Sequence, residues 1–304
     1  MSIQVKSFIT HKRGETDYDI QDSFDYDLER GRFALSDGVT NSFLPEVLSK
    51  MLTHAFVNDQ DNAIFPPDYL PQRFKELRDQ FMDALDEDAR MLQEMVEEEF
   101  HVAAATFVGL TLMDNVFSWQ VLGDSCLFIV PEDGHLRCFC SMPVNISPEW
   151  KLKVDFGNRP RQIHSDGTVV GEWTNGKRTI SKGWVVLASD ALSDWLIKQH
   201  NLGNDPIGRL WNLNDNVDFE NYVEEEYQAQ RLKSDDESAI IIKIDEEAGS
   251  PAGSEHPELA EPTNPSEPTD SSDYSTLSDS SDDFPGSFGY YDDFDYFDYS
   301  DYAI

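Results

Sequence analysis

The sequence has little cysteine, and this limits what its thiols are expected to do. Only three of the 304 residues are cysteines, namely Cys126, Cys138 and Cys140. Three cysteines do not make a disulfide framework, and Cys138-x-Cys140 has no second ligand pair at the spacing of a zinc site. We therefore expect small apolar residues on strands, in a protein of a reducing compartment.

Positive charge is also scarce. The chain has 23 Lys and Arg against 59 Asp and Glu, which gives a formal net charge of -36. Residues 246–304 contain 16 of the acidic residues and no Lys or Arg, so residues 1–245 carry a net charge of -20. Because both parts are acidic, a nucleic-acid partner held by a general basic surface is not expected.

Long apolar runs are missing as well. No stretch approaches the ~18 consecutive apolar residues of a membrane-spanning helix, and the first residues lack the apolar segment of a signal peptide. These absences predict a cytoplasmic protein with no membrane partner. Composition predicts two parts: residues 1–245 can bury a large core, whereas residues 246–304 predict a disordered acidic tail that ends in an Asp/aromatic stretch.

Strand patterns occur at both ends of the first part. Polar and apolar residues alternate over residues 2–9, and an aliphatic strand is predicted at 238–244. Residues 102–140 predict an antiparallel meander, with a hairpin turn at Asp114-Asn115, whereas residues 141–182 look irregular.

Helical spacing predicts the remaining elements. One helix is expected over residues 42–57, with Ser42 as its N-cap, and a long amphipathic helix over residues 69–100. Two more are expected from residue 191 and over residues 219–232. Since helices and strands are segregated rather than alternating, the pattern favours an α+β layered domain with largely antiparallel sheets.

Aspartates stand where the predicted buried strands end or begin. They are Asp22, Asp37, Asp124, Asp190 and Asp235. Carboxylates gathered at strand ends repel one another, and a bound cation makes such an arrangement tolerable. Oxygen ligands without His or Cys suit Mg²⁺ or Mn²⁺. Gly38 directly follows one of the aspartates and, without a Cβ, allows its backbone carbonyl to turn toward a metal ion.

The ordered set of motifs resembles the metal-dependent protein phosphatases of the 2C type, the PPM family, in a divergent bacterial-like branch. The segments that carry the resemblance are Gln21-Asp22, Ser36-Asp37-Gly38, Ala105-Thr106, Gly123-Asp124-Ser125, Ala188-Ser189-Asp190 and Asp235-Asp236-Glu237-Ser238. The resemblance covers about residues 5–245. It implies a PP2C-like α-β-β-α sandwich with two central antiparallel sheets.

The resemblance also implies roles for the aspartates. Asp37 would bridge two metal ions, one of which would also bind the Gly38 carbonyl. Asp190 and Asp235 would hold the other ion, and Asp124 stands where many bacterial relatives place a ligand of a third.

The implied activity is that of a protein-serine/threonine phosphatase. A metal-bridging hydroxide, on two or three Mn²⁺ or Mg²⁺ ions, would hydrolyse phosphoserine and phosphothreonine, with Asp22 orienting metal-bound water. The implied partner is a phosphorylated protein, either a cognate Ser/Thr kinase or its target.

One departure from the family pattern keeps an alternative open. Asp17 occupies the position where family members commonly carry a phosphate-binding arginine. His11, Lys12 and Arg13 lie further upstream, and we expect phosphate binding from His11 and Arg13. The alternative is a non-catalytic PP2C-fold module that binds or scaffolds phosphoproteins, with the acidic tail recruiting a partner.

Overall fold

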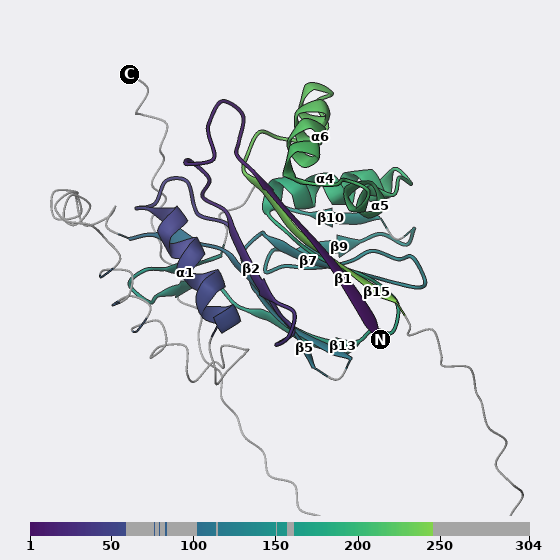
Figure 1. Ribbon diagram of the computed structural model, residues 1–304, viewed down its shortest axis with the longest axis horizontal. Coiled ribbons are helices and arrows are strands. Elements are labelled where there is room, and N and C mark those ends of the chain that lie inside the picture. The colour runs from purple at the N-terminus through teal and green to yellow at the C-terminus, as the bar shows by residue number, and fades with distance from the viewer. Residues whose placement is uncertain are drawn as a thin grey trace, which may run out of the picture. The chain divides into compact units, whose positions relative to one another are not determined.

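In the computed structural model, two five-stranded antiparallel sheets lie at the centre of the fold (Figure 1). The first sheet has the strand order β1 (Ser2–Thr10), β15 (Glu237–Asp245), β14 (Gly183–Ala188), β7 (Cys126–Pro131) and β8 (Arg137–Phe139). The second has the order β13 (Thr174–Thr179), β6 (Val116–Leu122), β5 (Phe107–Met113), β3 (Arg32–Ser36) and β2 (Ser23–Asp27). Smaller sheets are formed by β12 (Val169–Val170), β11 (Gln162–His164) and β4 (Ala104–Ala105), and by β10 (Leu152–Val154) and β9 (Val144–Ile146).

The structure describes most of the first 245 residues. The described ranges are 1–58, 76, 79, 83, 102–113, 115–149, 151–156 and 161–245. They belong to the first of two units of the chain, Met1–Ser250, and the second unit, Pro251–Ile304, lies outside them. The predicted tail, residues 246–304, therefore lies outside the described residues. Of the long helix predicted over residues 69–100, only residues 76, 79 and 83 are described, and each is helical.

The main core lies between the two large sheets. Phe33 and Val108 of the second sheet share one buried cluster with Val186 and Ile240 of the first. The six residues from Glu237 to Ile242 are all buried, because β15 packs against the second sheet and also against α4 (Asp190–Asn201). Helices α5 (Pro206–Trp211) and α6 (Asn216–Gln228) complete this helical layer. No described helix combines the length and apolarity that crossing a membrane requires.

Helix α1 (Pro45–Asn58) covers the second sheet. It buries Leu48, Leu52 and Phe56, four residues apart, against a second cluster that includes Ala34 and Phe107. Two sheets with helices on both outer faces confirm the predicted α-β-β-α sandwich.

The predicted N-cap of α1 is wrong. The helix begins at Pro45, a residue favoured at the first helical position, and Leu44 precedes it with a φ of 48°. Ser42 lies outside the helix, where its hydroxyl accepts a hydrogen bond from the Ala104 backbone N–H at 2.9 Å.

The irregular appearance of residues 141–182 was also misleading. This segment contains β9 to β13, including a six-residue edge strand of the second sheet. The sequence of β13, TNGKRT, has no apolar alternation because most of the strand is solvent-exposed. The last helix also starts earlier than predicted, at Asn216, where the Asp215 side chain accepts a hydrogen bond from the Asp218 N–H.

Candidate active site

The five aspartates predicted as a cluster come from five separate junctions of the fold. Asp22 directly precedes β2 and Asp37 directly follows β3. Asp124 lies in the turn between β6 and β7, Asp190 is the first residue of α4, and Asp235 lies two residues before β15. Asp22 and Asp124 are buried, whereas the other three are partly accessible.

The charges of these carboxylates act on one another's pKa. Burial raises the pKa of Asp37 well above its ordinary value, and the charges of Asp22, Asp190, Asp124 and Asp235 raise it further. Burial likewise raises the pKa of Asp124 to about 7, and the charge of Asp190 adds to the rise. The pKa of Asp190 rises to about 6, through burial and then the charge of Asp235. The structure thus places all five aspartates, from distant parts of the sequence, within range of one another's charge.

Asp22 is the most enclosed member of the cluster. It is 2 % exposed, and its Oδ2 accepts a hydrogen bond from the Ser238 hydroxyl at 2.7 Å. Its Oδ1 is buried and has no hydrogen-bond partner. A buried carboxylate oxygen without a donor is costly, so this oxygen is suited to a further ligand.

Thr106 fixes the backbone at Asp37. The Thr106 N–H donates to the Asp37 carbonyl at 2.8 Å, and the Asp37 N–H donates to the Thr106 hydroxyl at 3.3 Å. The same hydroxyl shares a hydrogen bond of 2.7 Å with the hydroxyl of Ser125, the residue after Asp124. This short network therefore fixes the turn that contains Asp37 relative to the turn that contains Asp124.

Gly38 is required by close packing. A Cβ at this position would lie 2.8 Å from both the Gln21 carbonyl oxygen and the Pro45 Cβ. Gly38 forms an isolated bridge with Ala105, but its neighbours make the two hydrogen bonds, through the Asp37 carbonyl and the Val39 N–H. The bridge therefore does not use the Gly38 carbonyl, which was predicted as a metal ligand.

Serine hydrogen bonds join Asp190 to the strand beside Asp235. The Ser189 N–H donates to the Ser238 carbonyl at 3.1 Å, and the Ser238 N–H donates to the Ser189 hydroxyl at 3.0 Å. Asp190 begins α4, where the helix dipole favours a negative charge. Asp190, at the start of α4, and Asp235, just before the start of β15, are thereby held close to each other.

Two lysines supply positive charge to the cluster. Burial raises the pKa of Asp235, and the charges of Lys12 and Lys233 counteract that rise. Lys233 acts in the same direction on the pKa of Asp190. The Lys233 side chain is 58 % exposed and lies 3.9 Å from an Asp194 oxygen, so it can turn toward a bound anion at little cost.

The two residues predicted to bind phosphate, His11 and Arg13, face α6. His11 Nε2 lies 3.9 Å from a Glu220 oxygen. The Arg13 guanidinium lies 3.5 Å from a Glu224 oxygen and 4.7 Å from the centroid of the Tyr227 ring. Each group thus has a glutamate partner on α6, and Arg13 also lies over an aromatic ring; their phosphate-binding role remains a prediction.

A cavity adjoins the cluster. It has a volume of about 240 Å³, and its lining includes His11, Arg13, Lys233, Asp235 and Glu237. Of the five aspartates, Asp235 alone is among the lining residues, so the cavity lies between this member of the cluster and the residues that face α6.

Comparisons with known proteins identify the fold. Stp1, a serine/threonine phosphatase from Staphylococcus aureus, is similar with a TM-score of 0.52 and 15% identity, over 81% of this chain and 96% of that structure. PstP from Mycobacterium tuberculosis is similar with a TM-score of 0.50 and 16% identity, over 81% of this chain and the whole of that structure. The PstP catalytic domain with two manganese ions is similar with a TM-score of 0.50 and 15% identity, over 80% of this chain and the whole of that structure. No family model and no curated protein matched the sequence.

The chain has the PP2C fold. Within this fold, the donor set of the five aspartates fits hard divalent cations, because it consists of carboxylate oxygens and includes an unpartnered one on Asp22. In the described part of the chain, no three acidic side chains bring their oxygens within 4.8 Å of one another. Carboxylates that repel one another are expected to stand apart in this way, and ions between them would draw them closer.

Two groups near the aspartates of this PP2C fold were not among the residues predicted from the sequence. Lys233 was not selected, although it lies only two residues before Asp235. Glu237 belongs to the Asp235-Asp236-Glu237-Ser238 motif but had no predicted role, yet it is 1 % exposed and has a buried, unpartnered Oε2. Burial raises the pKa of Glu237 to about 10, and the charge of Asp22 adds to the rise. Its position at the first residue of a buried strand was the available signal.

Proposed function

We propose that the protein is a metal-dependent serine/threonine protein phosphatase, which hydrolyses phosphoserine and phosphothreonine. The observation that carries the proposal is the mutual electrostatic effect of five aspartates from separate junctions of a PP2C fold. Five neighbouring carboxylates destabilise a fold unless protons or cations neutralise them, and near neutral pH the protons of Asp124 and Asp190 are lost. This repulsion lowers the stability of the fold, so a purely structural role does not explain why the carboxylates lie together at one end of the central sheets.

The proposed ligands are divided among the ions. Asp37 would bridge two ions, Asp190 and Asp235 would bind one of them, and the Gly38 carbonyl would bind the other. Asp124 would bind a third. Mn²⁺ or Mg²⁺, when bound, would supply Lewis-acid activation of water and charge neutralisation for a phosphoryl group.

The chain's own residues would orient the reactants. Asp22 is held by Ser238, so its free Oδ1 points in a fixed direction and can accept a proton from water. Asp17 occupies the position where the family commonly carries a phosphate-binding arginine. Lys233 and Lys12 would attract the phosphate dianion electrostatically in its place. The mobile lysine charge is expected to give weaker phosphate binding than a bidentate arginine.

The proposed substrate is a phosphorylated protein segment. The cavity beside Asp235 is lined by both acidic and basic side chains, among them Glu220, Glu224 and Lys233. A peptide with mixed charge next to the phosphorylated residue would find partners of opposite charge there. A serine/threonine kinase, or a target of one, fits this description.

The test is hydrolysis of p-nitrophenyl phosphate by wild type and Asp37→Asn, with Mn²⁺, with Mg²⁺ and with a chelator. We expect wild-type activity that requires a divalent ion, and a loss of at least about a hundredfold in the variant. Asp133→Asn is the matched control, because Asp133 lies in the exposed turn between β7 and β8 and pairs with Arg137. It should keep full activity.

Inactivity of the folded wild type with every divalent ion would contradict the proposal. It would favour the module that binds phosphoproteins without hydrolysing them. Phosphopeptide binding would then be measured with the same two variants.

A further inference from the structure

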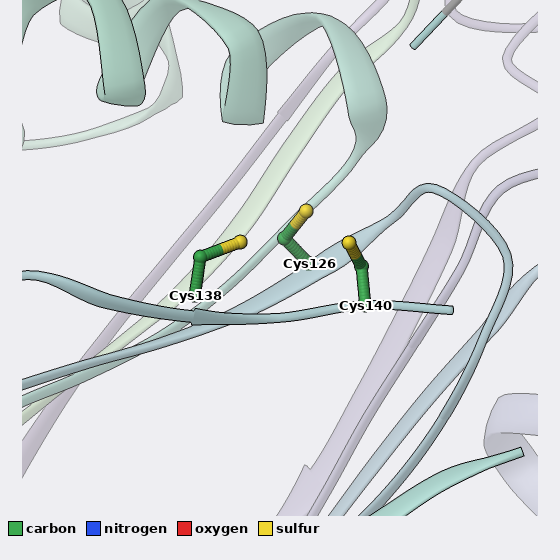
Figure 2. A group of neighbouring side chains, drawn as sticks. All are labelled: Cys126, Cys138 and Cys140. Carbon is green, nitrogen blue, oxygen red and sulfur yellow. The ribbon is translucent and has the colours of Figure 1, made fainter. Parts of the chain in front are cut away.

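The three cysteines of the chain converge on one point of the first sheet. Cys126 begins β7, Cys138 lies in β8 and Cys140 directly follows it. Leu127 pairs with Phe139, so the antiparallel register places Cys126 opposite Cys140. Cys138 and Cys140, two residues apart, then point to the same face. All three sulfurs lie within 4.8 Å of one another, on the same side of the two strands (Figure 2).

All three thiols are buried. Cys126 is 0 % exposed, Cys140 4 % and Cys138 8 %, and none of them forms a disulfide. A buried free cysteine is commonly a small apolar residue of the core. That explanation would suit any of the many core positions in both sheets, but it does not explain why every cysteine of the chain lies in this one group.

We infer that Cys126, Cys138 and Cys140 form a binding site for a thiophilic metal ion, of the class of Zn²⁺ or Cu⁺. Three convergent sulfurs are soft ligands, which select these ions rather than Mg²⁺ or Mn²⁺. With Zn–S bonds of about 2.3 Å, two sulfurs on one tetrahedral ion are about 3.8 Å apart, so the group needs only a small contraction. The sequence spacing offered no second pair to Cys138-x-Cys140, whereas the fold supplies Cys126.

Binding requires no oxidant or reductant. Each thiol loses a proton to solvent as its thiolate forms a bond to the ion, so up to three protons leave when one ion enters. A disulfide is the competing outcome. It would join only two of the sulfurs and leave the third without a role.

A bound ion would link β8, the edge strand of the first sheet, to β7, next to the turn that carries Asp124. Strand β8 has three residues and lies at the end of the first sheet. The Cys126 thiol donates a hydrogen bond to the Asp124 carbonyl at 3.2 Å, and the Ser141 N–H donates to the Gly123 carbonyl at 3.0 Å. Binding would remove the Cys126 proton and with it this hydrogen bond, so the ion would hold the turn that carries Asp124 through its bond to Cys126, two residues along the chain, and through the Ser141–Gly123 hydrogen bond next to Cys140. This role is independent of whether the protein hydrolyses phosphate.

The test is titration of the full, reduced, metal-free chain with Cd²⁺, which reports thiolate ligation by a near-ultraviolet charge-transfer band. Excess Mg²⁺ is present to occupy carboxylate sites. We expect a band that saturates at one Cd²⁺ per chain and that Zn²⁺ or Cu⁺ removes by competition. Which ion displaces Cd²⁺ at the lower concentration identifies the preferred metal. Cys138→Ala should weaken Cd²⁺ binding at least about tenfold, whereas Asp37→Asn should leave the band unchanged.

Two results would overturn the inference. One is the failure of the titration to depend on the thiols, seen either as no band in folded wild type or as unchanged Cd²⁺ affinity in Cys138→Ala and Cys140→Ala. The other, which needs no variant to fold, is a count of one reactive thiol in the denatured chain purified without reductant. That count would establish a disulfide in place of a metal site.

Discussion

Asp124 should make the metal-free fold progressively less stable as the pH rises, and Asp124→Asn should remove that effect. Burial raises the pKa of Asp124 from 3.8 to about 7, and the charge of Asp190 adds to the rise. Between these two values the folded protein holds a proton that the unfolded chain has released. The free energy of unfolding therefore falls as the pH rises through this range, and levels off above about pH 7. An asparagine has no proton to lose.

The size of the effect follows from the same two values. A pKa difference from 3.8 to about 7 corresponds to about 4 kcal/mol over the full range. The chain has an isoelectric point of about 4.2, so solubility limits the measurement to about pH 5 and above. Between pH 5 and pH 8, we expect the stability of Asp124→Asn relative to wild type to increase by about 2 to 3 kcal/mol.

The assay is urea unfolding of both proteins at pH 5, 6, 7 and 8, with a chelator and a reductant present. Asp133→Asn provides a control without pH dependence in this range, because the hydrogen bond from Arg137 lowers the pKa of Asp133 below 3.8 and its stabilising effect is complete before pH 5. The stability of Asp133→Asn relative to wild type should therefore stay constant from pH 5 to pH 8. Mn²⁺ should reduce the advantage of Asp124→Asn, since only wild type gains the carboxylate–ion interaction. A difference between Asp124→Asn and wild type that stays constant from pH 5 to 8 would refute the reasoning.

Two further substitutions test individual contacts. Lys233→Gln should raise the KM for p-nitrophenyl phosphate by roughly threefold to tenfold at low salt with little change in kcat, because an exposed charge attracts the phosphate. Lys198→Gln is its control: Lys198 also pairs with Asp194, at 2.6 Å, and should leave the KM unchanged, so equal effects would assign the loss to Asp194. Trp195→Phe should lower the free energy of unfolding by about 2 kcal/mol, since the Trp195 Nε1–H donates to Glu226 at 2.9 Å within the core. Chemical denaturation measures the loss, and an unchanged midpoint would show that this hydrogen bond does not stabilise the fold.

The aspartate cluster could be predicted because its members interrupt strong local patterns. Asp37 and Asp190 each end a run of buried aliphatic residues, and Asp235 precedes one. A run of this kind specifies a strand in the centre of a sheet, so the polar residue at its end has a fixed place. The layered α+β fold was predictable for a different reason, namely the segregation of strand patterns and helical patterns along the sequence.

Other features depend on contacts that have no local pattern. The strand β13 is an exposed edge whose residues pair with β6 through the backbone, so its sequence resembles that of a loop. Ser42 satisfied the usual preference for an N-cap, but Pro45 fixed the start of the helix three residues later. Lys233 lies in a loop, and its charge lowers the pKa of Asp190, the first residue of a helix that begins 43 positions earlier in the sequence. Such pairings arise only when the sheets assemble.

The raised pKa values and the proposed metal affinity have one physical origin. Burial and mutual repulsion make the carboxylate charges at Asp124 and Asp190 unfavourable, so at pH 6 protons compete for the same oxygens that would bind a divalent ion. The competition weakens as the pH rises through about 6 and about 7. Above that range Asp124 and Asp190 have lost their protons, so only cations can relieve the repulsion between these carboxylates. Lys12 and Lys233 supply part of that charge, but two monovalent side chains do not balance five carboxylates. The cluster therefore favours divalent ions for the same reason that it destabilises the metal-free fold.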